Sequence, residues 1–229
     1  MKKLVKFIAG CIFFASTTAS ASAIKLNSAT LTGVNVEYSQ EKIDGVEAVR
    51  VIKSMKVKEF DEPTFVLIPD VVFKDGTIEV KVLSRLLPDA PDFARGFIGV
   101  AFRINRDNSA FESIYIRPTN GRTDNVNRRQ NATQYFAYPD FKFDRLRKEA
   151  PGKYESPADI GLDEWIQLKI VVKGKMAELF INNAATPVLT VNDLKYSNTS
   201  GAIGLWVDIG TEGYFSDLRV TPLKDEESL

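Results

Sequence analysis

The sequence predicts an all-β protein, an antiparallel β-sandwich of one domain, and three observations carry that prediction. Short runs rich in β-branched and aromatic residues recur along the chain, separated by glycine, asparagine, aspartate and proline. Within these runs, apolar and polar residues alternate with the period of two that half-buried strands show. No long stretch has apolar residues at helical spacing. Such a chain buries one face of each strand by packing two sheets together.

The strand in Gly76–Leu83 shows the alternation most simply, with Ile78, Val80 and Val82 on one face. A glycine at 174 suits a tight turn, because glycine accepts positive φ at low cost. Leu86–Arg95 holds two prolines and is expected to be a loop. The other strands expected on the same pattern are Val46–Lys53, Phe97–Ile104, Phe111–Arg117, Trp165–Lys173, Met176–Asn182, Val188–Val191, Gly201–Val207 and Tyr214–Val220.

One connection, Thr119–Asp159, breaks the regular spacing. It is long, polar and basic in its middle, and an aromatic stretch, Tyr135–Phe141, follows the basic part. A connection of this length inside a compact domain is usually functional or contains a further strand. We expect Ala132–Tyr138 to be that strand.

The N-terminus has the form of a secretory signal peptide, residues 1–23. Lysines precede a short apolar core, and Ala21-Ser22-Ala23 fits the small-residue rule for cleavage. The alternative is lipid anchoring at Cys11, but only about four apolar residues precede that cysteine. We therefore favour cleavage near Ala23 and a periplasmic or secreted protein. Residues 24–222 form the single sandwich domain, residues 223–229 are a charged tail, and no later run reaches the ~18–20 apolar residues of a transmembrane segment.

The composition of the mature chain excludes several kinds of chemistry. The sequence has no histidine, and its one cysteine, Cys11, leaves with the signal peptide. Catalytic triads, Cys–His pairs, Cys/His zinc sites and disulfides are therefore excluded. Thirty basic and thirty acidic residues balance in the full sequence, and the signal peptide takes three lysines, so the mature net charge is about −3. This balance gives no electrostatic footprint for nucleic acid.

Five residues are the candidate ligand-binding set. Tyr115 and Arg117 are two apart in one strand and share a face, where a ring and a guanidinium suit a sugar. Arg103 joins them if it projects to the same sheet face. In the strand expected within the long connection, Gln134 and Tyr138 share parity and are favoured as ligand-facing. The alternative is that Arg117 pairs with a nearby carboxylate, and that Gln134 and Tyr138 only pack.

Two weaker groups of residues are also candidates. Arg122, Arg128 and Arg129 form a basic cluster that suits a uronate or sulfated glycan, or is simply a solvated surface. Calcium is a weak candidate, because the possible oxygen ligands form no contiguous calcium loop. These oxygen-bearing residues are Asn182, Asp208 and Asp217. We therefore assign no metal site and no cofactor.

Several segments in order resemble a known superfamily. They are Gly76–Val82, Gly96–Arg103, Phe111–Pro118, Gln134-Tyr135, Asp163–Trp165, Ala177–Asn182, Gly201–Trp206 and Phe215–Val220. This series resembles a concanavalin A-like lectin/glucanase domain, close to laminin-G-like domains and to secreted bacterial domains grouped with 3-keto-disaccharide hydrolases. The resemblance covers about Val34 to Pro222 and implies a jelly roll. The Glu-x-Asp-x-x-Glu strand of laminarinase-type members is missing here, so no catalytic residue is assigned.

Together these features favour a secreted or periplasmic carbohydrate-binding module whose partner is an oligo- or polysaccharide. One alternative is a hydrolase or lyase that uses carboxylate or tyrosine chemistry on saccharides. Another is an adhesion or structural module. Two carboxyl groups about 5–10 Å apart in a groove would favour the hydrolase, and a large exposed apolar patch would favour the adhesion module.

Overall fold

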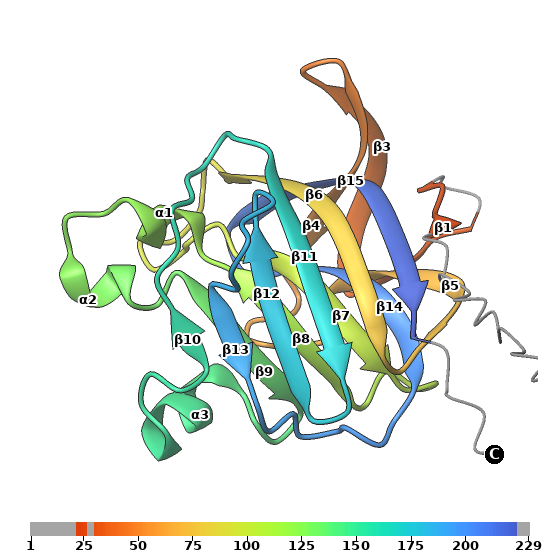
Figure 1. The fold of residues 1–229 in the computed structure, drawn as a ribbon. Helices are drawn as coiled ribbons and strands as arrows, with labels where there is room; N and C mark the ends of the chain where they lie inside the picture. The colour runs from red at the N-terminus through yellow and green to blue at the C-terminus, as the bar shows by residue number, and fades with distance from the viewer. Residues whose placement is uncertain (1–21, 27–29, 224–229) are drawn as a thin grey trace, which may run out of the picture.

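The computed structural model describes residues 22–26 and 30–223. Residues 1–21 of the predicted signal peptide and residues 224–229 of the tail lie outside the described residues. The described chain forms two antiparallel sheets packed face to face, which confirms the predicted jelly-roll sandwich (Figure 1). Within these residues, no helix has both the length and the apolar character that crossing a bilayer requires.

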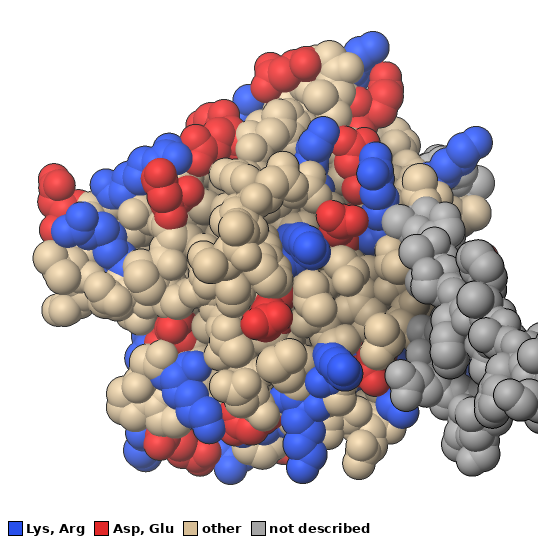
Figure 2. Space-filling view, viewed as in Figure 1, with Lys and Arg blue, Asp and Glu red and all other residues tan. Residues whose placement is uncertain are grey.

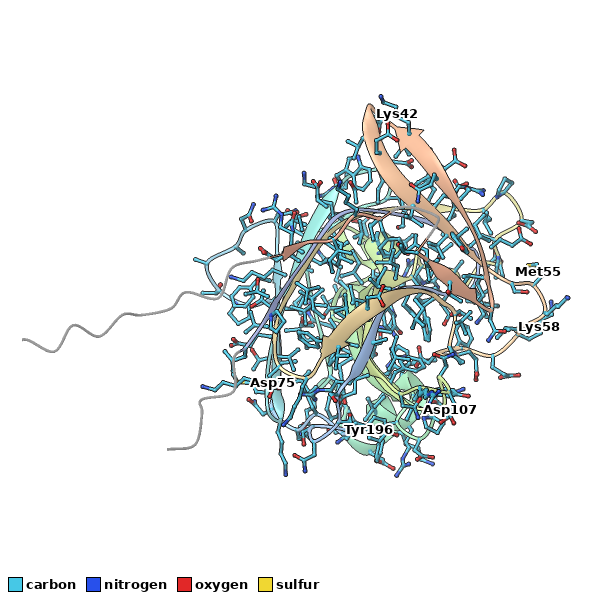
Figure 3. All side chains as sticks on the ribbon, turned by 90° about the vertical axis from the view of Figure 1, so that its right-hand side faces the viewer. Lys42, Met55, Lys58, Asp75, Asp107 and Tyr196 are labelled. Atoms are coloured by element: carbon cyan, nitrogen blue, oxygen red, sulfur yellow. The ribbon has the colours of Figure 1, made fainter. Side chains whose placement is uncertain are left out.

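Sheet 1 is the eight-stranded layer of the described chain. In order across the layer, its strands are β13 (Leu189–Val191), β12 (Met176–Ile181), β11 (Ile166–Lys173), β6 (Gly76–Leu86), β15 (Thr211–Pro222), β4 (Val46–Lys53) and β3 (Val36–Ile43). The short β1 (Ser22–Ala23) also pairs with β15. The β3–β4 hairpin projects beyond the sandwich, with Lys42 near its tip (Figure 3).

Sheet 2 is the seven-stranded layer. Its order is β10 (Glu155–Ser156), β9 (Thr133–Tyr138), β8 (Phe111–Ile116), β7 (Ile98–Ile104), β14 (Gly201–Val207), β5 (Phe65–Phe73) and β2 (Thr32–Val34). Three short helices lie on one side of the sandwich, in the connections around β9 (Figure 1). They are α1 (Pro118–Gly121), α2 (Val126–Arg129) and α3 (Phe143–Glu149).

The main core lies between the two sheets. Ile78, Val80 and Val82 of β6 are fully buried, as their alternation predicts. From sheet 2, Ile98 faces them, because a Cβ added to Gly213 of β15 would lie 3.0 Å from the Ile98 Cδ1. Ile98 pairs with Ile116 across β7 and β8, so these side chains share the inward face.

The opposite face of sheet 2 carries a second buried layer, which is aromatic. Its largest members are Phe65, Phe111, Tyr115, Phe136 and Trp206. Two segments cover it, residues 54–64 between β4 and β5 and residues 139–149 around α3. The Trp206 Nε1 donates to the Glu62 carbonyl at 3.0 Å, which ties the first segment to this face. Because both faces are covered, every residue of β7 and β8 is buried.

Every strand predicted from alternation is present, including β9 in the long connection, with ends that differ by up to three residues. Five strands had no prediction, namely β1, β2, β3, β5 and β10. The three helices had none either, because the longest has seven residues and is too short to show a helical period. The long connection therefore contains both a strand of sheet 2 and helices that cover one edge of it.

Candidate ligand-binding site

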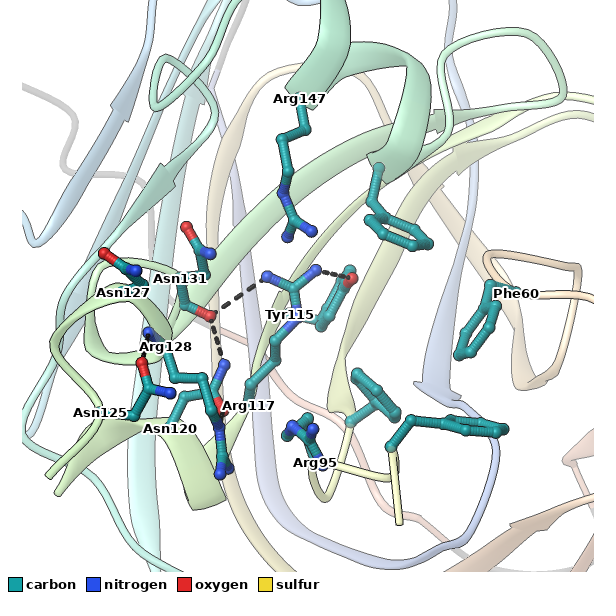
Figure 4. A pocket seen from close by; sticks show the side chains of 13 residues that line it. Phe60, Arg95, Tyr115, Arg117, Asn120, Asn125, Asn127, Arg128, Asn131 and Arg147 are labelled. Carbon is teal, nitrogen blue, oxygen red and sulfur yellow. Dashed lines mark hydrogen bonds between the residues drawn. The ribbon is translucent and has the colours of Figure 1, made fainter. Parts of the chain in front are cut away.

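A cavity of about 380 Å³ opens at the end of sheet 2 where β7 begins and β8 ends. Four arginines line it, Arg95, Arg117, Arg128 and Arg147, and none of its lining residues is acidic. The other lining side chains are asparagines 120, 125, 127 and 131, the phenylalanines 60, 93, 97 and 143, and Tyr115. Figure 4 shows Asn125, Asn127 and Arg128 on one side and Phe60 on the other. The cavity thus has a polar, cationic wall and an aromatic wall.

The floor of the cavity exists because a glycine separates two large rings. Gly99 of β7 pairs with Tyr115 on one side and with Trp206 on the other. A Cβ at this position would lie 2.3 Å from the Ile114 carbonyl oxygen and 2.6 Å from the Tyr115 Cβ. Without a Cβ, the rings of Tyr115 and Trp206 meet across β7 with centroids 4.8 Å apart. Any larger residue at 99 would displace the floor.

Arg117 is held by a network of buried groups behind the cavity. Its Nη1 donates to Glu155 at 2.8 Å and to the Asn131 carbonyl at 3.1 Å. Its Nη2 donates to the Tyr115 hydroxyl at 2.7 Å and to the Gln134 Oε1 at 3.1 Å. The residue precedes a proline, which favours the extended backbone that turns β8 into α1. Its guanidinium is therefore largely committed to the protein, as the carboxylate-pairing alternative expected.

Tyr115 is fully buried, and its chemistry follows from that burial. Burial raises the pKa of the Tyr115 phenol well above its ordinary value, although the Arg117 charge opposes the change. The hydroxyl accepts a hydrogen bond from Arg117 and stays protonated at neutral pH. A lyase that uses tyrosine chemistry needs the tyrosine as a general base, and a phenol that stays neutral is unsuited to that role.

Arg95 and Arg128 make up the cationic wall with neutral partners only. The Arg95 Nη1 donates to the carbonyls of Asp92 and Ala94 at 2.6 and 2.7 Å. Arg128 donates to the Asn120 Oδ1 at 3.0 Å and to both oxygens of Thr119. Burial, and then the charges of Arg128 and Arg117, lower the pKa of Arg95. The charges of these two arginines repel each other, and their hydrogen-bond partners are neutral. The cationic wall therefore has a local excess of positive charge.

The excess is local because the rest of the surface is mixed. On the face shown in Figure 2, basic and acidic side chains are interspersed over the whole area. The sequence as a whole is balanced, with 30 residues of each sign. The positive cavity is therefore a feature of its lining and not of the protein's net charge.

The aromatic wall is formed by phenylalanines from three segments. The Phe60 ring contacts Phe93, Phe97 and Phe143 edge to face, with centroids 5.4, 6.2 and 5.7 Å apart. Phe93 remains 48% exposed, which is unusual for a large apolar ring. It also borders a second cavity of about 290 Å³ next to Met55. The exposed ring therefore stands between two hollows.

The structure brings together only part of the predicted set. Tyr115 and Arg117 line the cavity. Gln134 is fully buried behind them, and its Oε1 accepts a hydrogen bond from Arg117. Tyr138 lies elsewhere, stacked on Phe111 with centroids 5.2 Å apart. The face that carries these residues is covered over most of its length, so only its end is open to a ligand.

Arg103 requires a correction, because it does not project to the face of Tyr115. Its φ of 53° and the irregular register of β7 with β14 break the alternation at this point. The guanidinium turns to the inner face of sheet 2, where it donates to Glu112 of β8 at 2.7 Å, and it also reaches Asp75, just before β6 of sheet 1, at 2.9 Å. It also reaches the Gly174 carbonyl at 3.0 Å. Arg103 therefore does not share a face with Tyr115 and Arg117, and it is not part of the candidate site.

The predicted basic cluster is divided between two places. Arg128 lines the cavity, whereas Arg122 donates to Asp159 at 2.6 Å and to Glu164 at 3.0 Å on the surface. Of the weak calcium candidates, Asp208 is buried against Lys53, and Asp217 pairs with Lys81 at 2.6 Å. Three or more His, Cys, Asp or Glu side chains arranged for a metal do not occur in the described part of the chain.

Sequence reasoning missed Arg95, Arg147 and the whole aromatic wall. Arg147 comes from α3 and reaches the cavity by pairing with Glu155, which also holds Arg117. Hydrogen bonds from Arg147 and the charge of Arg117 keep the pKa of Glu155 low, against the effect of burial. These residues are far apart in sequence, and no local spacing marks them as one site.

A buried carboxylate anchors the segments that form the aromatic wall. Asp61 accepts from the backbone amide of Phe143 at 2.7 Å, and its own amide donates to Asp208 at 3.0 Å. Asp208 in turn pairs with Lys53 at 2.5 Å. Burial, and then the charge of Asp208, raise the pKa of Asp61 to about 7. Asp61 therefore links residues 54–64, α3 and the loop that follows β14.

This raised pKa predicts a pH-dependent stability. Between about pH 4 and 7 the folded protein keeps a proton on Asp61 that the unfolded chain has released, so stability falls as pH rises. Asp61→Asn should remove that fall, which is on the order of 3 kcal/mol. Asparagine tolerates the φ of 52° at this position. Urea unfolding from pH 4 to 8 measures the slope. Asp44→Asn, at an exposed position with a φ of 51°, is the control; equal slopes for Asp61→Asn and the unaltered protein would contradict the assignment.

Comparisons with known proteins support the fold. No protein-family model matches the chain, and no curated protein sequence matches it. Among solved structures, the carbohydrate-binding module CBM66 from Bacillus subtilis matches with a TM-score of 0.53 and 17% identity, over 82% of this chain and 93% of that one. A putative glycosyl hydrolase from Parabacteroides distasonis matches with a TM-score of 0.50 and 10% identity, over 86% and 89%. The chain therefore shares its jelly-roll sandwich fold with these two proteins, a fold that agrees with the resemblance to the concanavalin A-like lectin/glucanase superfamily.

Proposed function

We propose that this protein is a glycan-binding module and that the cavity at the end of sheet 2 holds the sugar. The observation that carries the proposal is the combination of an exposed ring, Phe93, with a wall of arginine and asparagine side chains in one cavity. Sugars present an apolar C–H face and polar hydroxyl groups, which suit these two walls. The carbohydrate-binding module from Bacillus subtilis shares the fold.

The cavity gives the hydrolase alternative no support. Glycoside hydrolysis uses two carboxyl groups that flank the scissile bond. None of the described residues lining the cavity is aspartate or glutamate. Glu155, the carboxylate that pairs with the lining residues Arg117 and Arg147, is held by both of them. A binding role fits this lining better than acid–base chemistry.

Export is part of the proposal and rests on residues 1–23. Cleavage after Ala23 would remove β1, which pairs Ser22 and Ala23 with Val220 and Arg219. The hydrogen bond from the Ile24 amide to the Leu218 carbonyl, at 2.9 Å, would remain. N-terminal sequencing of protein from the periplasm or medium should therefore begin at Ile24. A chain there that retains residue 1 would contradict cleavage, and a protein found in neither fraction would contradict export.

The test of the binding function is a glycan panel followed by one substitution. Affinity gels with neutral and acidic polysaccharides should show retention of the protein. Phe93→Ala should weaken binding of the retained glycan by roughly 3- to 10-fold, because it removes the exposed ring. Phe180→Ala is the control, since this partly exposed ring stands in β12 of sheet 1 under Lys169. Equal losses for the two variants, or retention by no glycan, would contradict the proposal.

A further inference from the structure

The charges in the cavity do not balance. Glu155 is shared by Arg117 and Arg147, so one carboxylate faces two guanidinium groups. Arg95 and Arg128 pair with no carboxylate of the described chain. The residues that line the cavity therefore carry an excess of positive charge, which the more distant charge of Asp92 opposes only in part.

The protein fixes the positions of Arg95 and Arg128, the two arginines that carry this excess charge. Both Arg95 and Arg128 are only partly exposed. Arg95 is tied to the loop before β7 by two backbone carbonyls, and Arg128 is tied to α1 by Asn120 and Thr119. Repulsion among partly buried like charges is unfavourable, so fixing the two groups near each other has a cost in stability. A bound anion would offset that cost.

The remaining donors suit an oxyanion. A guanidinium has five N–H donors. The Arg95 Nε and Nη2 and the Arg128 Nη1 have no partner among the described residues. Carboxylate and sulfate oxygens accept from such a fork in two parallel bonds. Beside them, the side-chain amides of Asn127 and Asn131 also have no partner within the described chain and line the same cavity. They would serve the hydroxyl groups of the sugar.

Resting on the proposed function, we propose that the cavity selects a sugar that carries a carboxylate or sulfate group. Arg95 and Arg128 hold the anionic group, and the ring of the sugar lies toward Phe60 and Phe93. Figure 4 shows that Arg95 and Arg128 reach the cavity from different segments and that Phe60 stands across from Asn125 and Asn127. The proposal assigns the ligand class of the site and the two residues that choose it.

The experiment compares ligands that differ only in charge. Isothermal titration uses oligogalacturonate against its methyl ester, and κ-carrageenan oligosaccharides against their desulfated form. The charged member of at least one pair should bind at least ten-fold more tightly than its neutral match, by the usual strength of charged hydrogen bonds. Its binding should weaken from 50 to 500 mM NaCl, because salt screens the attraction. Preference within the first pair identifies a carboxylate, and preference within the second identifies a sulfate.

Two substitutions then test whether Arg95 and Arg128 are responsible for the preference for the charged ligand. Arg95→Gln and Arg128→Gln remove the positive charge but keep a polar side chain, and each should weaken binding of the charged ligand about ten-fold or more. The matched control is Arg106→Gln. Arg106 is exposed in the β7–β8 hairpin, at the far end of the strands from the cavity. The Arg106→Gln variant should therefore bind the ligand with the affinity of the unaltered protein. Thermal unfolding of each variant verifies that it is folded.

The outcomes separate this inference from the function on which it rests. Equal affinity for charged and neutral members, with no effect of salt, overturns the selection for an anion and leaves glycan binding intact. A charge preference that survives both Arg95→Gln and Arg128→Gln overturns the assignment of these residues. If neither the four ligands nor any glycan of the panel binds, the proposed function fails and this inference fails with it.

Discussion

Replacing Arg103 with methionine is expected to lower the free energy of unfolding by about 3–5 kcal/mol. The Arg103 and Glu112 side chains are both 0% exposed, and Arg103 also pairs with Asp75. Removing the guanidinium leaves the Glu112 carboxylate buried, with only neutral donors from Tyr135 and Tyr196. A buried charge without its partner is far more costly than a lost surface ion pair. Urea unfolding at pH 7 measures the change.

Two further variants make this result specific. Arg106→Met removes an exposed arginine three residues away and should change stability by less than about 0.5 kcal/mol. Adding Glu112→Gln to Arg103→Met should restore part of the lost stability, because it removes the uncompensated charge. If Arg103→Met costs less than about 1 kcal/mol, the buried Arg103–Glu112 pair does not contribute to stability in the way that its burial predicts.

Arg117→Ala is expected to destabilise the protein by about 2–4 kcal/mol and to abolish binding in the cavity. The change breaks four hydrogen bonds to buried or partly buried groups, among them Glu155, Gln134 and the Tyr115 hydroxyl. Glu155 keeps Arg147, which limits the loss. Thermal unfolding followed by circular dichroism measures stability, and titration with the retained glycan measures binding.

The matched control for Arg117 is Arg122→Ala. Arg122 also makes two ion pairs, with Asp159 and Glu164, but its side chain is 54% exposed. Exposed pairs contribute about 0–1 kcal/mol, so this variant should be nearly as stable as the unaltered protein. If the two substitutions lower the free energy of unfolding equally, burial does not make the Arg117 network more stabilising than an exposed ion pair, and the account of Arg117 is contradicted.

Alternation predicted the strands well, because burial between two sheets imposes the period of two. Ile78, Val80 and Val82 are the simplest case, and their burial is complete. The same rule groups Arg103 with Gly99 and Ala101 on the face opposite Ile98, but it holds only where the pleat is regular. A positive φ at Arg103 and the register shift beside it reverse the direction of the side chain. Nothing in the local sequence marks that irregularity.

The site was predictable only in the part that lies on one strand. Tyr115 and Arg117 share a face by spacing alone and both line the cavity. Arg95, Arg147 and Phe60 come from a loop, a helix and the segment after β4, and they meet only once the chain has folded. The alternation pattern also could not predict that two segments cover the aromatic face of sheet 2. Aromatic residues such as Phe65, Phe111 and Trp206 are as compatible with an open ligand-binding face as with a second buried layer.

The central claim is that a glycan binds in the cavity at the end of sheet 2. Backbone amide NMR during titration with the retained glycan tests it most directly, because it reports where the ligand lies without any substitution. The largest shifts are expected in residues 93–97, 115–131 and 143–147, which supply most of the lining. Shifts confined to the outer face of sheet 1, around Glu79 and Lys169, would contradict the claim.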